Sequence, residues 1–274
     1  MTPGILVSVV ASVIAATIAY GRRFLTLPAA FAAATLGGIV LFFGGWDWGA
    51  ATAGSFFITA LLSQRHQRST TSYEDARRNL PQVFANGLVL AVLAVVYRTG
   101  GESYVVVAAF LGCVGAVAGD TWATTSAQFS TTEPRLLTTG KRVPPGTPGA
   151  VTATGMALTA AAGFVACTLY LFSVTAFDGE IVARQIAVVL GLAAVVGALT
   201  GSLFDSYLGA ALQAQYTDTE GRLTDHPLAN NGDQNSYVRG WRWLSNDFVN
   251  FSNSVAGAVS AYFVCFTAKL LGVV

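Results

Sequence analysis

Three aspartates stand at the edges of long apolar segments. Asp120 and Asp205 each end such a segment, and Asp247 opens the last one. A carboxylate at the C-terminal end of a helix faces the negative end of the helix dipole, which destabilises its charge. We therefore expect a positive group to lie near Asp120 and near Asp205. Because hard oxygen ligands suit magnesium, we expect the three aspartates to be catalytic and to bind Mg²⁺. The alternatives are that all three lie at a water interface and that Asp247 caps a helix.

Polar side chains continue from two of these aspartates. Ser202 and Ser206 flank Asp205, and we expect both serines to contact substrate phosphates. After Asp247, polar residues at helical spacing share one face; they are Asn246, Asn250, Asn253 and Ser254. We expect Asn246 and Asn250 to line a ligand or metal site, with hydrogen bonding between helices as the alternative.

A loop rich in proline and glycine has the composition of a phosphate site. Its prolines stiffen the chain, its glycines let backbone N–H groups approach a ligand, and the N-terminus of an expected helix follows. No GxxxxGK[ST] sequence occurs in the chain. The residues expected to bind phosphate are Lys141, Arg142, Gly146, Thr147 and Gly149.

A second pair of cations precedes another expected helix. Arg77 and Arg78 come just before Pro81, a residue favoured in the first turn of a helix. Gln82 and Asn86 extend the polarity into that helix. We expect Arg77 or Arg78 to bind a phosphate; the alternative is a solvated surface.

The composition shows what must position these residues. Of 274 residues, 53% are hydrophobic and only 11% are charged, whereas soluble domains carry about 25% charged residues. This excludes soluble, disordered and disulfide-scaffold classes, and a net charge of +1 excludes a basic field for nucleic acid. The sequence predicts an all-α, polytopic membrane bundle with the lipid bilayer as a partner.

Eight apolar segments predict eight transmembrane helices in a single integral membrane domain, 1–274. They cover 3–20, 26–45, 49–63, 82–97, 104–119, 150–174, 185–204 and 247–270. Twelve of the fifteen Lys and Arg residues fall in alternate gaps, which predicts that these gaps are cytoplasmic and that both termini lie outside. The large cytoplasmic loops are expected near 64–81, 120–149 and 205–246, in the cell membrane of a prokaryote.

Two segments, Gly115–Gly119 and Gly197–Gly201, are weakly similar in sequence, and an aspartate follows each of them. A repeated pair of helices would explain this similarity. Small residues that let membrane helices approach closely would explain it equally well.

Four blocks of sequence together resemble the integral-membrane phytyl-phosphate kinase family of the vitamin E salvage pathway, which also includes many uncharacterised membrane proteins. The blocks are Gly119-Asp120-Thr121-Trp122-Ala123, Val143-Pro144-Pro145-Gly146-Thr147, Gly201–Ala210 with Gln213, and Asn246-Asp247-Phe248-Val249-Asn250. The resemblance extends from about Arg77 to Ser254. The chain departs from the family at Thr125, where a glutamate is usual, and at Pro148-Gly149-Ala150.

The resemblance implies a reaction. A nucleoside triphosphate, with CTP favoured, would phosphorylate an isoprenyl monophosphate such as phytyl, farnesyl or geranylgeranyl phosphate to the diphosphate. Two alternatives stay open: a transporter for an anion or metal, and another lipid-phosphate transferase. Assembly as a homodimer is also left open.

Overall fold

The computed structural model describes residues 3–69, 77–101, 103–125, 132–218, 221, 223–225, 227–228 and 232–274. Eight α-helices lie within these residues: α1 (Ile5–Gly21), α2 (Leu27–Gly44), α3 (Trp46–Ser69), α4 (Leu80–Gly100), α5 (Tyr104–Thr125), α6 (Ala153–Ser173), α7 (Arg184–Ala211) and α8 (Asn246–Leu270). A π-helical turn, η2 (Val174–Asp178), extends α6. The predicted all-α membrane bundle is confirmed.

Six of these helices are long and apolar enough to cross a bilayer: α2, α4, α5, α6 with η2, α7 and α8. The α1 helix is apolar but has only 17 residues. The α3 helix packs against α2, α5 and α6 and carries charged residues in its last turns. The protein is therefore an integral, multi-pass membrane protein.

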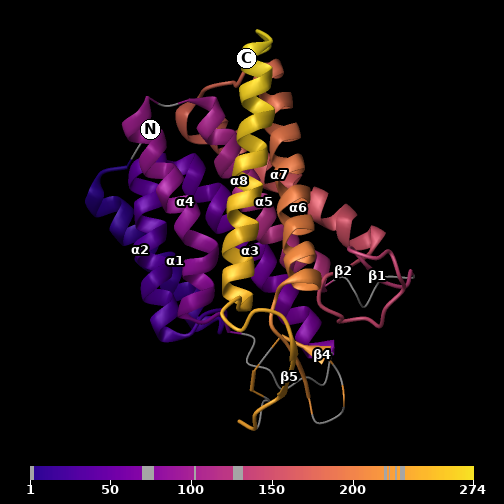
Figure 1. Cartoon of the computed structure of the whole chain (residues 1–274). Coiled ribbons are helices and arrows are strands. Elements are labelled where there is room, and N and C mark those ends of the chain that lie inside the picture. Colours follow the sequence, from indigo (N-terminus) through magenta and orange to yellow (C-terminus); the bar gives the residue numbers. More distant parts are fainter. Residues whose placement is uncertain are drawn as a thin grey trace.

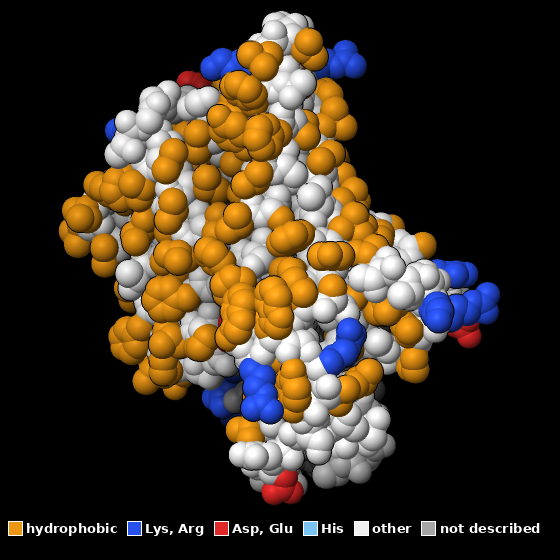
Figure 2. Space-filling model, in the orientation of Figure 1, with side chains coloured by type: hydrophobic (Ala, Val, Ile, Leu, Met, Phe, Trp, Pro, Cys, Tyr) orange, Lys and Arg blue, Asp and Glu red, His pale blue; other side chains and the backbone are white. Residues whose placement is uncertain are grey.

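The helices alternate in direction, so their connections gather at two ends (Figure 1). One end, called here the loop end, carries the short strands and residues 22–26, 77–79, 132–152, 212–218 and 232–245. Both chain termini lie toward the opposite end (Figure 1). Hydrophobic side chains cover the bundle between the two ends on the face shown in Figure 2.

The α5 helix is the centre of the bundle. Of its most apolar window, 78% is buried, against 22–44% in the other five candidate spans. It packs against α7 and α8 through glycines, because a Cβ on Gly112 would lie 2.5 Å from the carbonyl oxygen of Gly257. A Cβ on Gly197 would lie 2.6 Å from the Gly112 Cα. A Cβ on Gly115 would lie 2.8 Å from the Gly163 Cα of α6, so glycines of both segments, Gly115–Gly119 and Gly197–Gly201, serve close helix packing.

Five short strands in the described part of the chain stand outside the bundle. β1 (Arg135–Leu136) pairs antiparallel with β2 (Ala150–Val151). A three-stranded sheet has the order β4-β3-β5, built from β4 (Leu223–Thr224), β3 (Gln215–Thr217) and β5 (Ser236–Arg239). Gln215 Nε2 donates to the Gly209 carbonyl at 2.9 Å and ties this sheet to the last turn of α7.

Candidate active site

Asp120 and Asp205 come together at the loop end of the bundle. The apolar pattern predicts that each aspartate ends its helix, but α5 continues five residues past Asp120 and α7 six past Asp205. In this continuation of α5, Thr124 Oγ1 donates to the Asp120 carbonyl at 2.9 Å. Trp122 anchors the same turn by donating through Nε1 to Thr59 Oγ1 of α3 at 2.9 Å.

The carboxylates of Asp120 and Asp205 interact electrostatically, and both side chains are partly buried. Asp205 Oδ2 is fully buried and has no hydrogen-bond partner in the described part of the chain. A buried, unpaired carboxylate oxygen is costly, and a second carboxylate nearby adds repulsion. A cation would relieve both costs.

Two carboxylates suit Mg²⁺. This ion is usually held by one or two carboxylates, and water and substrate phosphates complete its shell. Among the described residues, no group of three His, Cys, Asp or Glu side chains could hold a metal ion by itself. Asp120 and Asp205 would therefore hold Mg²⁺ together with the phosphates, and Asp247 as a third ligand stays a prediction.

Arg78 lies close to Asp120, one member of this acidic pair. Its guanidinium donates from Nη2 to Thr121 Oγ1 at 3.1 Å and interacts electrostatically with Asp120. The same group lies 5.8 Å from the centre of the Phe56 ring. Burial lowers the pKa of Arg78, and the charge of Asp120 acts in the opposite direction. The guanidinium nevertheless stays protonated at neutral pH.

Backbone contacts fix the position of Arg78. Its N–H donates to the Phe24 carbonyl at 2.9 Å, and its carbonyl accepts from Thr26 N–H at 3.1 Å. The next residue, Asn79, caps α4 in a reciprocal capping box with Gln82. Arg77, in contrast, is exposed. Of the two predicted arginines, Arg78 is the one that interacts with Asp120.

Asp225 is a site residue that the sequence analysis missed. Its charge acts on Asp205, and its Oδ2 accepts from Gln213 Nε2 at 3.3 Å. Gln213 belongs to one of the four blocks of the resemblance, so its side chain was the available signal. Asp225 itself lies in a polar segment with no periodicity to single it out.

The polar stripe of α8 is largely a packing device. Asn253 Nδ2 donates to the Ala116 carbonyl of α5 at 3.3 Å. Ser254 Oγ donates to the Ala85 carbonyl of α4 at 3.4 Å. These bonds are the interhelical hydrogen bonding expected as the alternative to a ligand site. Asn246 and Asn250 are partly buried, and their ligand role stays a prediction.

Asp247 does not cap α8. Ser245 is the N-cap residue, and its side chain accepts from Phe248 N–H at 3.4 Å. Asp247 lies in the first turn, where a carboxylate is stabilised by the positive end of the helix dipole.

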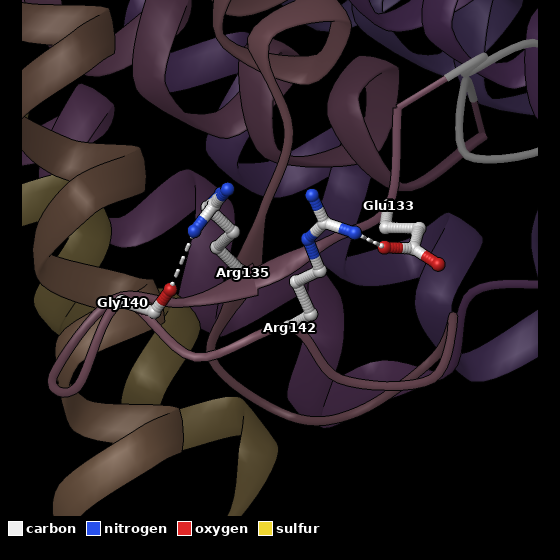
Figure 3. Close-up of polar contacts among 4 residues, drawn as sticks. All are labelled: Glu133, Arg135, Gly140 and Arg142. Carbon is white, nitrogen blue, oxygen red and sulfur yellow. Dashed lines mark hydrogen bonds and ion pairs between the residues drawn. The ribbon is translucent and has the colours of Figure 1, made fainter.

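The predicted phosphate loop forms the β1–β2 hairpin. Lys141 and Arg142 are exposed on it. Arg142 pairs with Glu133 at 2.8 Å, and Arg135 Nη1 donates to the Gly140 carbonyl at 3.0 Å (Figure 3). Thr147 Oγ1 donates to the Pro144 carbonyl at 2.7 Å. The hairpin is thus ordered by its own contacts, and the Lys141 ammonium extends from an exposed position.

Gly149 joins this hairpin to α7 beside Asp205. Its φ is +78°, and a Cβ there would lie 2.5 Å from the Ser206 carbonyl oxygen and 2.5 Å from Ala210 Cβ. Gly146 has a φ of +85° with open space around it. Ser202 is buried and Ser206 partly buried on the same helix. The hairpin is therefore anchored one residue from Asp205.

Fold and site together define a polytopic helical membrane protein with an acidic, arginine-flanked site at one end. The model of the family described as integral membrane protein DUF92 matches residues 10–258. The chain belongs to this integral-membrane family, which confirms the family assignment drawn from the four sequence blocks.

Two relatives give the extent of the similarity. "Protein PGR" of Arabidopsis thaliana is 34% identical over 194 residues, which cover 65% of this chain and 66% of that protein. "Uncharacterized membrane protein MJ0933" of Methanocaldococcus jannaschii is 28% identical over 181 residues, covering 65% of this chain and 70% of that protein. The chain thus spans about two thirds of the length of these relatives. No solved structure matches the chain.

Proposed function

We propose that this protein is a membrane-bound prenyl-phosphate kinase. It transfers the terminal phosphoryl group of a nucleoside triphosphate, with CTP the favoured donor, to an isoprenyl monophosphate such as phytyl, farnesyl or geranylgeranyl phosphate. The reaction takes place on the cytoplasmic face of a prokaryotic cell membrane. The observation that carries the proposal is the buried, unpartnered Asp205 oxygen near Asp120, with Arg78 close to Asp120.

The chemistry needs positioning more than it needs a base. An oxygen of the acceptor phosphate forms a bond to the γ-phosphorus, and the bond from that phosphorus to the β–γ bridging oxygen breaks. The products are the prenyl diphosphate and the nucleoside diphosphate. Because the acceptor oxygen is already ionised at neutral pH, no side chain has to remove a proton. The protein has to align the two phosphates and neutralise their charge.

The site residues divide these tasks. Arg78 binds the acceptor phosphate, and Asp120 and Asp205 are the residues that would hold Mg²⁺. When bound, Mg²⁺ supplies charge neutralisation on the phosphate oxygens. Lys141 and Arg142 on the hairpin, with the amides of Gly146–Gly149, bind the donor phosphates. The Gly149 contact with α7 supports this arrangement, because it ties the hairpin to the turn that carries Asp205.

The test is a product assay with purified protein. Each of three prenyl monophosphates is offered with each of four nucleoside triphosphates in Mg²⁺ buffer, and the lipid products are identified by mass spectrometry. We expect a prenyl diphosphate that disappears with a chelator and returns with excess Mg²⁺. The Asp178→Asn variant, altered near the opposite end of the bundle, serves as a control and should keep its activity. A folded wild-type protein that forms no diphosphate from any pair would rule the proposal out.

A further inference from the structure

A cavity lies between α1, α2, α3, α4 and α5, on the side of α5 away from α7. Most of its lining is aliphatic or aromatic, with representatives such as Ala16, Val40, Leu90 and Val117. The polar side chains in the lining are Ser12, Thr52, Ser55, Thr59, Arg78 and Asn86. Arg78 thus supplies the charge in this lining, and it is the residue that faces Asp120.

The cavity extends along the length of α3. On α3 its lining extends from Gly49 to Thr59, a separation of about 15 Å at 1.5 Å per residue. This is about half of the hydrocarbon thickness of a bilayer. Arg78 and Phe56 stand toward the loop end of the lining, and Leu41 and Gly49 stand toward the other end. A Cβ on Gly49 would lie 2.3 Å from Leu41 Cδ2, so α2 and α3 touch there.

We infer that this cavity holds the hydrocarbon chain of the lipid monophosphate substrate, with Arg78 at the phosphate and the contact of Leu41 with Gly49 as the limit for the chain. This assignment rests on the proposed function. It adds where the hydrocarbon chain of the substrate lies and what limits the length of that hydrocarbon chain. Burial in an apolar cavity stabilises a hydrocarbon, and a guanidinium binds a phosphate well. A cavity with a mostly apolar lining and a guanidinium at one end fits an anionic lipid with one chain.

Ala53 gives a direct way to shorten the cavity. It lies one helical turn from Gly49 on the same face of α3 and lines the cavity. A leucine at this position would occupy the end of the cavity. Ala50 is a matched control, because it is also partly buried on α3 and is absent from the lining.

The experiment measures equilibrium binding of radiolabelled farnesyl and geranylgeranyl monophosphate to purified protein without nucleotide. Ala53→Leu should weaken binding of the longer geranylgeranyl chain by about tenfold or more, since several carbons lose burial. Binding of the shorter farnesyl chain should change much less. Ala50→Leu should leave both affinities near the wild-type values. Equal effects of Ala53→Leu and Ala50→Leu on both lipids would overturn the assignment.

A second measurement does not depend on the folding of Ala53→Leu. A geranylgeranyl monophosphate analogue with a diazirine at the end of its chain is photolysed on the wild-type protein in phosphatidylcholine vesicles. Label should appear in peptides of α2 and α3 around Leu41 and Gly49. Label confined to α6, α7 or α8 would contradict the assignment.

These readouts separate the inference from the proposed function. Specific binding with the expected chain dependence and no phosphoryl transfer would reject the kinase and keep the lipid cavity. Phosphoryl transfer with a chain preference unaffected by Ala53→Leu, and with label away from α2 and α3, would keep the kinase and reject the cavity.

Discussion

At the scale of single residues, the chemistry depends on charges that have few partners within the protein. Asp205 has a fully buried, unpartnered oxygen in the described structure, and its neighbours include the carboxylates of Asp120 and Asp225. Such a cluster would destabilise the fold unless something positive joined it. Arg78 supplies part of that charge through Asp120. The remaining negative charge of the carboxylates is available to bind a metal ion, which in turn binds phosphates. A phosphoryl-transfer site uses its carboxylates in this way.

Replacing Asp205 with asparagine should remove activity and keep the fold. The substitution preserves the size of the side chain and removes its charge, and loss of one such electrostatic contact typically lowers kcat by about 10²–10³-fold. Steady-state kinetics measures the loss, and size-exclusion chromatography checks the fold. Full activity with unchanged magnesium dependence in Asp205→Asn would show that this carboxylate is no metal ligand.

Arg78 and Arg77 form a natural matched pair. Arg78→Lys keeps the charge and loses the forked geometry of the guanidinium, so we expect the KM for the prenyl monophosphate to rise about tenfold. Arg77→Lys, at the exposed neighbour, should have little effect on this KM. Kinetics with varied prenyl monophosphate distinguishes the two variants. Equal effects would make both arginines ordinary surface cations.

The sequence was a good guide to some of these residues and a poor guide to others. Asp120 and Asp205 were predictable at the same end of the bundle. One span, α6, separates α5 from α7, so α5 and α7 run in the same direction and end on the same side. The choice of Arg78 over Arg77 depends on the backbone pairing of Arg78 with Leu25, which no local pattern encodes. Asp225 reaches Asp205 only through the folding of β3 and β4, so its position requires tertiary structure.

At the scale of elements, the β1–β2 hairpin depends on Gly149 for its attachment to α7. Gly149→Ala should raise the KM for the nucleotide, because the new methyl group would meet the Ser206 carbonyl and displace the hairpin. Gly140→Ala is the control. Gly140 also has a positive φ, +67°, but open space surrounds it, so both variants carry the left-handed strain of about 1–2 kcal/mol. An equal nucleotide KM in the two variants would argue against a phosphate role for the hairpin.

The packing of α5, α7 and α8 gives a prediction about stability. A methyl group on Gly197 would lie 2.6 Å from Gly112 Cα and 2.7 Å from the Gly257 carbonyl oxygen. Overpacking of this kind costs about 1–3 kcal/mol, so Gly197→Ala should lower the unfolding temperature in detergent. Gly191→Ala is the control in the same helix, because its methyl group would meet only Cys167 Sγ, at 4.0 Å. Equal unfolding temperatures of the two variants would contradict the close packing.

At the scale of the whole molecule, hydropathy predicted the number and order of the eight helices in the described residues and misjudged their ends. Of the eight predicted membrane spans, six are long and apolar enough to cross a bilayer. The segment predicted at 49–63 is the helix Trp46–Ser69, and the segment predicted at 104–119 continues to Thr125. Hydropathy marks where a helix leaves the lipid, whereas the helix itself continues until capping or sequence ends it. The cavity lined by α1, α2, α3, α4 and α5 could not be predicted from the sequence, because it depends on how these five helices pack.

The topology is testable with single cysteines. The three natural cysteines, Cys113, Cys167 and Cys265, are buried, so added ones can be labelled selectively. We expect a membrane-impermeant maleimide to label Gly4→Cys and Val273→Cys in intact cells, and to label Gly146→Cys only after the cells are opened. This follows from the concentration of basic residues at the loop end. Labelling of Gly146→Cys in intact cells would place the site on the outer side.

The central claim is that the acidic site transfers a phosphoryl group to a prenyl monophosphate. The most direct measurement is ³¹P NMR of purified wild-type protein with geranylgeranyl monophosphate, CTP and Mg²⁺, run beside Asp205→Asn. The account predicts that two resonances of a prenyl diphosphate grow as the monophosphate resonance declines, and that the variant shows neither within the same time. A monophosphate resonance that stays constant with every nucleoside triphosphate, in a folded wild-type protein, would contradict the account.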